Sequence, residues 1–321
     1  MGRLLLDRLL QALLVVILVV TTSFVVIRLA PGDPFAQQME AEGAGAEQRE
    51  RLKQAFGFDR PIAEQYLRFV ANAARGEFGF STSRNTEVRE VLARALPPTL
   101  LLMGLALSIG LLGGIALGAW QGWRPDRLAA RLTDRLGLVA VSIPEFVLAL
   151  LLLLGPALAL RWFPVNGARS LVPPAEPLPA LFDRLHHLVL PALSLALVLT
   201  AVVARHQRAA MDEVRDAPFV RAARARGVAE STLLWRHALR SALVPVLTLA
   251  GVILPSLVGG AVLVERVFAW PGMGSVLVDA VTARDYHLVV GAVLVGSVAV
   301  VSGTLVADLA LLWADPRQRR T

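Results

Sequence analysis

Apolar residues in this 321-residue sequence gather into long runs that hydrophilic stretches separate. Several runs approach about 20 residues, the length that an α-helix needs to cross the hydrocarbon core of a bilayer. A soluble domain does not carry such runs repeatedly, and this chain is 55% hydrophobic with a mean hydropathy of +0.60. The pattern predicts an all-α integral membrane protein with six transmembrane helices, over Leu9–Ile27, Leu100–Trp120, Gly137–Leu160, Pro191–Val203, Ala242–Val264 and Leu288–Trp313.

The first apolar run invites comparison with a cleavable signal peptide. It follows Arg3 and Arg8, but its apolar core is too long, and no A-x-A-like cleavage site precedes Arg28. We therefore expect a retained first transmembrane helix within residues 1–30.

Residues 31–97 form a long hydrophilic stretch with nine basic and ten acidic residues. Helical spacing is visible over Ala46–Phe56 and Pro61–Arg75, so we expect a small extracytoplasmic domain here. A loop of this length crosses a membrane regardless of its charge, and it is left out of the orientation count.

The arginines give the orientation of the remaining chain. They lie at the ends of apolar runs and in loops, which favours membrane topology over nucleic-acid binding as the origin of the +7 net charge. Six spans place both termini on one side. The connections on that side hold 17 arginines and the short loops on the other side hold five, so both termini are predicted to be cytoplasmic.

Small residues form a regular stripe along the second run. Ala106, Gly110, Gly114, Gly118 and Gly122 recur at every fourth position, which gives a helix one smooth face for close packing against another helix.

Two other runs carry candidates for a polar pathway through the bilayer. Pro144 is expected to kink or open the third run, where Glu145 is either a functional carboxylate or a group hydrated near the interface. Breakers in the fifth run indicate either a pore-lining helix or simple kinked packing. The pathway candidates are Ser142, Pro144, Glu145, Pro255, Gly259 and Gly260.

A basic segment at residues 216–245, between two apolar runs, has the pattern of a helix, a glycine turn and a second helix. Asp216 is the expected N-cap of the first helix, with Pro218 in its first turn. Gly227 is expected to end it in the left-handed conformation, and Ser231 to cap the second helix. Such a helix either docks into a groove of another protein or merely keeps the loop cytoplasmic.

This segment, FVRAARARGVAESTLLWRHALRSALVPVLTLAG, resembles the cytoplasmic coupling loop of ATP-binding-cassette importer permeases of the dipeptide/oligopeptide/nickel branch. Many importers have Glu-Ala-Ala followed by Gly there, and this chain has Arg221 in place of the Glu. The stretches PGDP, GFDRP with Tyr66, GEFGFS, SIPEF and VERVFAWPGMG are similar to other parts of the same family. The residues that the resemblance places in ATPase coupling are Phe219, Arg221, Ala222, Ala223, Arg224 and Gly227.

The resemblance implies a type I importer permease fold in a bacterial plasma (inner) membrane. It also implies three kinds of partner: a second permease subunit in a heterodimer, two cytoplasmic ATPase subunits and an extracytoplasmic substrate-binding protein. The chain would form half of a peptide pathway and convert ATPase motion into alternating access. The expected parts are residues 1–30, 31–97, 98–315 with the coupling loop at 208–240, and a cytoplasmic tail at 316–321.

The sequence lacks the motifs of an ATPase or another enzyme. A phosphate-binding loop requires G-x-x-x-x-G-K-[S/T], and the one lysine, Lys53, is followed by Gln54. The sequence has no cysteine, and no third ligand lies near the adjacent pair His186 and His187 in an outer loop, so a metal site is not expected. We therefore expect no cofactor on this chain, with ATP and Mg²⁺ used by partner subunits.

Two alternatives stay open at this point. Nickel or another small solute would be carried by a permease of the same family. A self-contained secondary transporter would need buried ionisable groups, for which Glu145 and Asp308 are the candidates. A membrane-embedded hydrolase would need a convergent catalytic set, and the sequence offers none.

Overall fold

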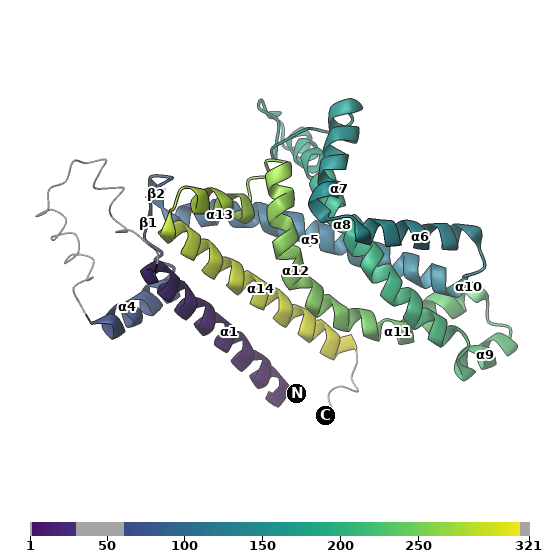
Figure 1. The fold of residues 1–321 in the computed structure, drawn as a ribbon. Helices are drawn as coiled ribbons and strands as arrows, with labels where there is room; N and C mark the ends of the chain where they lie inside the picture. Colours follow the sequence, from purple (N-terminus) through teal and green to yellow (C-terminus); the bar gives the residue numbers. More distant parts are fainter. Residues whose placement is uncertain (1, 30–60, 315–321) are drawn as a thin grey trace, which may run out of the picture. The chain divides into compact units, whose positions relative to one another are not determined.

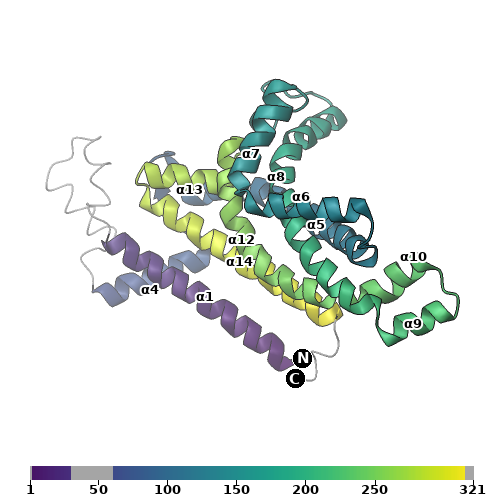
Figure 2. The same cartoon turned by 45° about the vertical axis from the view of Figure 1, so that its right-hand side comes forward.

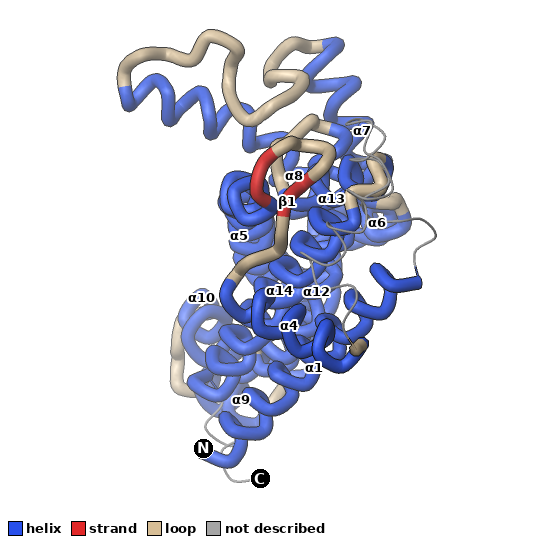
Figure 3. Tube along the Cα trace, turned by 90° about the vertical axis from the view of Figure 1, so that its left-hand side faces the viewer, coloured by secondary structure: helices blue, strands red, loops and turns tan. Residues whose placement is uncertain are grey.

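The computed structural model describes residues 2–29 and 61–314, and helices make up most of these segments (Figures 1 and 3). The chain divides into two compact units, Met1–Leu96 with Val276–Ser302 and Pro97–Ser275 with Gly303–Thr321. The helix expected over Ala46–Phe56 and the tail at 316–321 lie outside the described residues.

The first unit is built on α1 (Gly2–Leu29) and α4 (Ile62–Arg75). Helix α4 confirms the prediction for Pro61–Arg75, and it ends where Gly76 turns into the left-handed region at φ 75°. The two helices meet at Tyr66, whose hydroxyl lies 2.8 Å from that of Thr21 and whose ring packs edge-on against Phe24. A short antiparallel hairpin, β1 (Phe80–Ser81) and β2 (Thr86–Glu87), follows with Phe80 opposite Glu87.

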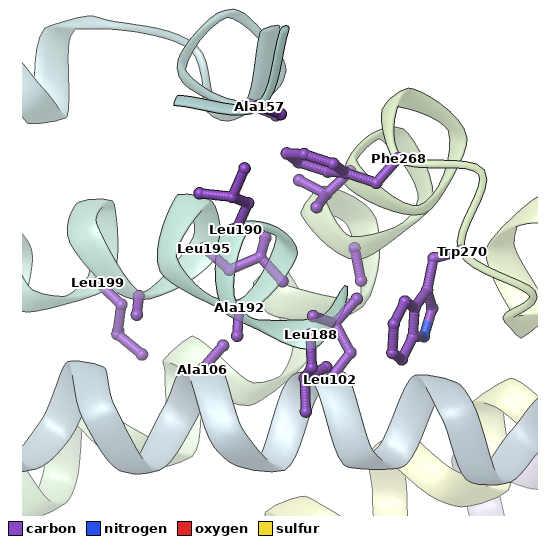
Figure 4. Close-up of a cluster of buried hydrophobic side chains, with 14 of the residues drawn as sticks. Leu102, Ala106, Ala157, Leu188, Leu190, Ala192, Leu195, Leu199, Phe268 and Trp270 are labelled. Atoms are coloured by element: carbon purple, nitrogen blue, oxygen red, sulfur yellow. The ribbon is translucent and has the colours of Figure 1, made fainter. Parts of the chain in front are cut away.

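The second unit contains most of α5 (Val88–Trp123), together with α8 (Pro177–Arg215) and α12 (Val244–Val267). Figure 4 shows the core that these helices share. Leu102 and Ala106 of α5 face a row of leucines on α8, and Phe268 and Trp270 close the cluster at the end of α12. The buried α8 leucines are Leu188, Leu190, Leu195 and Leu199.

The glycine stripe of α5 packs directly on α8, as predicted. Leu199 and Val203 of α8 lie against Gly110 and Gly114, and a methyl group on Gly118 would meet the carbonyl oxygen of Ala204. The helices approach so closely that backbone touches backbone.

The third run is interrupted at Pro144, where the sequence predicted a kink or an opening, and its first helix begins at Leu128, before the predicted Gly137. Helix α6 (Leu128–Ser142) ends at Ile143, and α7 (Glu145–Leu152) with the π-helical segment η1 (Leu153–Ala159) leaves at an angle of 107°. The cause is local, because a residue before proline is driven out of the helical region, and Ile143 has φ −90° and ψ 127°.

The fourth helix starts earlier and ends later than the predicted Pro191–Val203. Helix α8 begins at Pro177, where a proline costs no hydrogen bond, and continues through Pro191 to Arg215. His186 and His187 therefore lie on a helix and not in an outer loop. Proline 191 is tolerated inside the helix because Leu188, Leu190 and Ala192 around it are buried in the core.

Two helices complete the described chain, α13 (Met273–Thr282) and α14 (Tyr286–Ala314). Helix α13 lies within the stretch predicted to be an outer loop. Among the described residues, four helices are long and apolar enough to cross a membrane, and the bent pair counts as a fifth if it is one span. The four are Arg8–Val26, Val88–Trp123, Pro177–Arg215 and Tyr286–Ala307.

Candidate functional site

The predicted coupling segment forms a short helix, α9 (Pro218–Ala225), that follows directly on α8. In Figure 2, α9 and the next helix, α10 (Glu230–Thr232), lie beyond the end of α8. The expected N-caps are wrong in both cases. Asp216 is the C-cap residue that follows α8. The N-cap residues of α9 and α10 are Ala217 and Ala229, and neither makes a side-chain cap hydrogen bond.

Extended backbone at Ala217 and a proline in the first turn define the start of α9 instead.

The glycine turn at the end of α9 agrees with the prediction in detail. Gly227 has φ +79°, in the region that favours glycine. Its N–H donates to the carbonyl of Arg224 (3.0 Å), and the N–H of Val228 donates to that of Ala223 (3.3 Å). These two bonds are the paired interactions of a Schellman motif, so the turn satisfies the last carbonyls of the helix.

Helix α9 has two distinct faces. Val220 and Ala223 are buried, whereas Phe219, Arg221 and Ala222 are exposed, with 46% of the Phe219 surface accessible. The helix therefore turns Val220 and Ala223 toward the protein and leaves Phe219, Arg221 and Ala222 on its outer side.

The buried face of α9 belongs to a second apolar core below the first. Its α5 and α8 members include Trp123 and Met211, and it is completed by the segment that leads into α12. That segment consists of α10, the π-helical η2 (Leu233–Ala238) and α11 (Leu239–Ala242). The buried residues of this lower core are Ala119, Trp123, Ala210, Met211, Val220, Ala223, Leu233, Leu234, Ala238 and Ala242.

Polar contacts surround this lower core. The carboxylate of Glu230 accepts hydrogen bonds from Arg224 Nε (2.7 Å) and from Trp123 Nε1 (3.1 Å). Arg224, as the nearest cation, holds the pKa of Glu230 below its ordinary value, and the same bond raises the pKa of Arg224. Arg215 donates to the carbonyl of Gly122 (3.0 Å), and Arg208 pairs with Asp134 of α6.

The pathway candidates fall in two places. Ser142, Pro144 and Glu145 lie together at the α6–α7 break, where the Ser142 hydroxyl donates to the carbonyl of Leu138 (2.8 Å) and Glu145 is half-buried in the first turn of α7. Pro255, Gly259 and Gly260 lie on the α12 backbone, but their surroundings are outside the described part, as are those of Asp308.

A buried carboxylate at the end of α12 was not singled out from the sequence. Glu265 is fully buried and accepts hydrogen bonds from the Thr99 hydroxyl (2.5 Å) and the Ser275 N–H (3.1 Å). Thr99 in turn accepts from the N–H of Met273 (2.8 Å), and the Trp270 indole donates to the carbonyl of Pro98 (3.1 Å). One carboxylate thus holds the WPGMG turn against the start of the second unit.

The first unit has a comparable cluster around Asp285. Its Oδ2 accepts from the Ser81 hydroxyl (2.6 Å) and from the Ser83 hydroxyl and N–H (2.8 and 3.0 Å), and Oδ1 accepts from the N–H of Leu288 (3.1 Å). Burial alone would raise the pKa of this carboxyl, but the hydrogen bonds hold it below its ordinary value. Asp285 therefore fixes the hairpin to the turn before α14.

The two adjacent histidines have separate partners. His186 Nε2 lies 2.9 Å from the Trp162 carbonyl, and His187 Nδ1 lies 2.8 Å from the carbonyl of Asp183. In the described residues, no three His, Cys, Asp or Glu side chains come together in a way that could hold a metal ion.

Family models cover nearly the whole chain. Residues 110–320 match the "Binding-protein-dependent transport system inner membrane component", and residues 1–103 match the corresponding amino-terminal model, "Binding-prot-dependent transport system membrane comp, N-term". The chain belongs to this family. It is a multi-pass permease subunit of an ATP-binding-cassette importer, and its family is not one of enzymes.

Curated relatives extend over almost the full permease. The chain is 36% identical to the oligopeptide transport system permease protein AppB of Bacillus subtilis (strain 168), over 92% of each chain. It is 33% identical to the glutathione transport system permease protein GsiC of Escherichia coli (strain K12), over 97% of each.

A solved structure gives the fold. A chain of the inward-facing MetNI methionine ABC transporter matches with a TM-score of 0.56 and 16% identity, over 70% of this permease and 96% of that chain. The permease therefore has the type I importer fold.

Proposed function

We propose that this permease imports peptides, as half of a pathway whose other half is a second permease subunit. The relatives support the substrate class, because one is named for oligopeptides and another for glutathione, itself a small peptide. Two cytoplasmic ATPase subunits drive the transport, and an extracytoplasmic binding protein delivers the substrate. The permease itself binds no cofactor.

The observation that carries the coupling role is the outward face of α9. Phe219, Arg221 and Ala222 are exposed on a helix that a Schellman turn and a buried inner face hold in place. A rigid helix with an exposed aromatic anchor suits insertion into a groove of an ATPase subunit. Ala223 holds the inner side of this helix in the core, and Gly227 forms the turn that ends it.

The proposed topology has six spans. They are the four apolar helices, the α6–α7 pair and, in addition, α12. Both termini and α9 lie in the cytoplasm, and residues 31–97 lie outside a bacterial plasma membrane. The 17-to-5 distribution of arginines supports this orientation.

The natural absence of cysteine makes this topology testable without background labelling. Thr82→Cys lies in the exposed hairpin loop and Arg226→Cys at the end of α9. In intact spheroplasts, a membrane-impermeant maleimide is expected to label the first variant and to reach the second only after permeabilisation. The opposite result would invert the orientation.

Transport is tested by co-expressing the permease with its neighbouring genes and reconstituting the purified complex. We expect ATP-dependent uptake of a labelled oligopeptide that requires the binding protein. Ni²⁺ uptake in place of peptide uptake would change the substrate class. Uptake by the permease alone, driven by an ion gradient without ATP, would establish a secondary transporter.

A further inference from the structure

Glu230 joins three separate elements of the second unit. Its carboxylate lies between Arg224 on α9 and Trp123 at the end of α5, while Glu230 itself begins α10. We propose that Glu230 is a positioning residue that fixes α9 to α5, so that a displacement of α9 is carried into the spans. This inference rests on the proposed function, in which an ATPase subunit moves α9.

The geometry closes a triangle of side chains. One carboxylate oxygen, Oε1, accepts from Arg224 Nε at 2.7 Å, and the other, Oε2, accepts from Trp123 Nε1 at 3.1 Å. The third side is a cation–π contact, with the guanidinium carbon of Arg224 5.6 Å from the centroid of the Trp123 ring. An ordinary surface ion pair has two members, and here the indole N–H is a third.

The triangle changes the role of Arg224. The family resemblance places this residue in ATPase coupling, where a free guanidinium would contact the partner. In the structure, its Nε is engaged by Glu230 and its charged group lies over Trp123. We therefore assign Arg224 to the transmission of movement within the permease, and Phe219 and Arg221 to the contact surface.

The elements behind the triangle cannot slide independently. Arg215, at the end of α8, donates to the Gly122 carbonyl of α5 (3.0 Å), one residue before Trp123. Methyl groups built on Gly118 and Gly122 would meet the carbonyl oxygens of Ala204 and Arg208, so α5 and α8 are already in backbone contact. A force applied to α9 therefore reaches α5 and α8 through the same few residues.

The exposure of the Arg224 and Glu230 side chains distinguishes a positioning role from a role in folding stability. The side chains of Arg224 and Glu230 are 40% and 45% exposed, and ion pairs this accessible contribute little to folding stability. The buried core under α9, with Val220 and Ala223, remains when the carboxylate is neutralised. Glu230→Gln is thus expected to assemble normally and to show its defect in coupling.

The experiment measures peptide transported per ATP hydrolysed by the reconstituted complete importer. Glu230→Gln and Trp123→Phe are expected to lower this ratio at least about fivefold, with normal subunit composition. The matched control is Glu213→Gln, an exposed glutamate in the last turn of α8, which is expected to keep the wild-type ratio. Glu230→Asp is expected to recover part of the coupling because it restores the charge.

A double variant of Arg224 and Glu230 provides a second test, because the effects of two groups that act together are not additive. If the two groups act as one unit, Arg224→Gln with Glu230→Gln is expected to be no worse than either single change. A wild-type ratio in Glu230→Gln and in Trp123→Phe would overturn the proposal. If Glu230→Gln does not assemble, Trp123→Phe decides, since it keeps a ring in the core and removes the donor.

The same experiment distinguishes a failure of the peptide-import proposal from a failure of the proposed role of Glu230. If the unmodified importer shows no ATP-dependent peptide uptake, the peptide-import proposal is wrong. If that importer works and the variants match it, only the role of Glu230 is wrong.

Discussion

The hydroxyl of Thr99 donates a 2.5 Å hydrogen bond to the carboxylate of Glu265, a residue 166 positions away in the sequence. Both side chains are buried, and the same threonine accepts a backbone hydrogen bond from Met273. This pair connects the beginning of the second unit to the turn that follows α12.

Removing the Glu265 carboxylate is expected to destabilise the permease. In Glu265→Ala, the Thr99 hydroxyl and the Ser275 N–H lose their acceptor in a buried place, at a cost of about 3 kcal/mol. Thermal unfolding of the purified complex, followed by size-exclusion fluorescence, checks this loss. Glu265→Gln keeps the shape and one acceptor and should lose less. Equal melting of Glu265→Ala and the wild type would contradict the assigned role.

The contact between α5 and α8 is expected to tolerate no side chain at Gly118. A methyl group there would meet the Ala204 carbonyl oxygen and lie 2.8 Å from Cβ of Gln207, so Gly118→Ala should cost about 1–3 kcal/mol through overpacking. Gly104 on the same helix is the control, because a methyl group on it meets no described atom within 4 Å. Membrane expression and melting of the two alanine variants give the comparison, and similar losses in both would argue against close packing.

Gly227 is expected to act through backbone conformation alone. No described atom lies within 4 Å of a methyl group built on it, so the cost of a side chain comes from φ +79°. Gly227→Val should disfavour the turn by about 1–2 kcal/mol and reduce recovery of the ATPase subunits in co-purification. Gly227→Asn tolerates the left-handed region better and should recover them more fully. Equal recovery from the two variants would mean that the turn does not matter for assembly.

The link between Asp285 and the hairpin is expected to depend on pH. Its pKa is held below the ordinary value, so its stabilisation is complete above about pH 4 and is lost as the pH falls through the lowered folded value. Asp285→Asn should therefore lower the free energy of unfolding at neutral pH by about 1–3 kcal/mol relative to the wild type. Its melting temperature should be lower, and the difference should shrink below about pH 4. Melting curves from pH 7 to pH 3 test this.

Asp279→Asn supplies the control for that series. Asp279 forms an exposed ion pair with Arg84 (2.7 Å), in the same part of the first unit. Exposed pairs contribute about 0–1 kcal/mol, so this variant should stay close to the wild type at every pH. A larger effect in Asp279→Asn than in Asp285→Asn would contradict the interpretation of the buried cluster.

Short-range patterns predicted much of this fold. The helix over Pro61–Arg75, the glycine stripe on α5 and the left-handed turn at Gly227 all depend on spacing or on one residue's backbone preference. These signals lie within one element each, and the structure confirms them.

Element boundaries at polar residues were less predictable. Asp216 and Ser231 have the chemistry of N-caps, but proline and extended alanines define the helix starts instead. The buried core around Leu188 and Leu190 carries α8 through Pro191, which local preference alone would place at a helix start.

The Glu265 and Asp285 clusters could not be derived from spacing. Thr99 and Ser81 lie 166 and 204 residues from their partners, and single serines and threonines give no periodic signal. The neighbourhood of Glu265 did carry one hint, the WPGMG turn. A methyl group on Gly272 or Gly274 would collide with the Glu265 carboxylate, so these glycines make room for it.

The close packing of α5 on α8 has a consequence at the level of the gene. Every single-nucleotide missense change in a glycine codon gives a residue with a larger side chain, so Gly110, Gly114, Gly118 and Gly122 have no sterically silent neighbour in the genetic code. Each of these positions meets α8 atoms within 3 Å of an added Cβ. A missense mutation in any of the four codons will therefore push two helices apart.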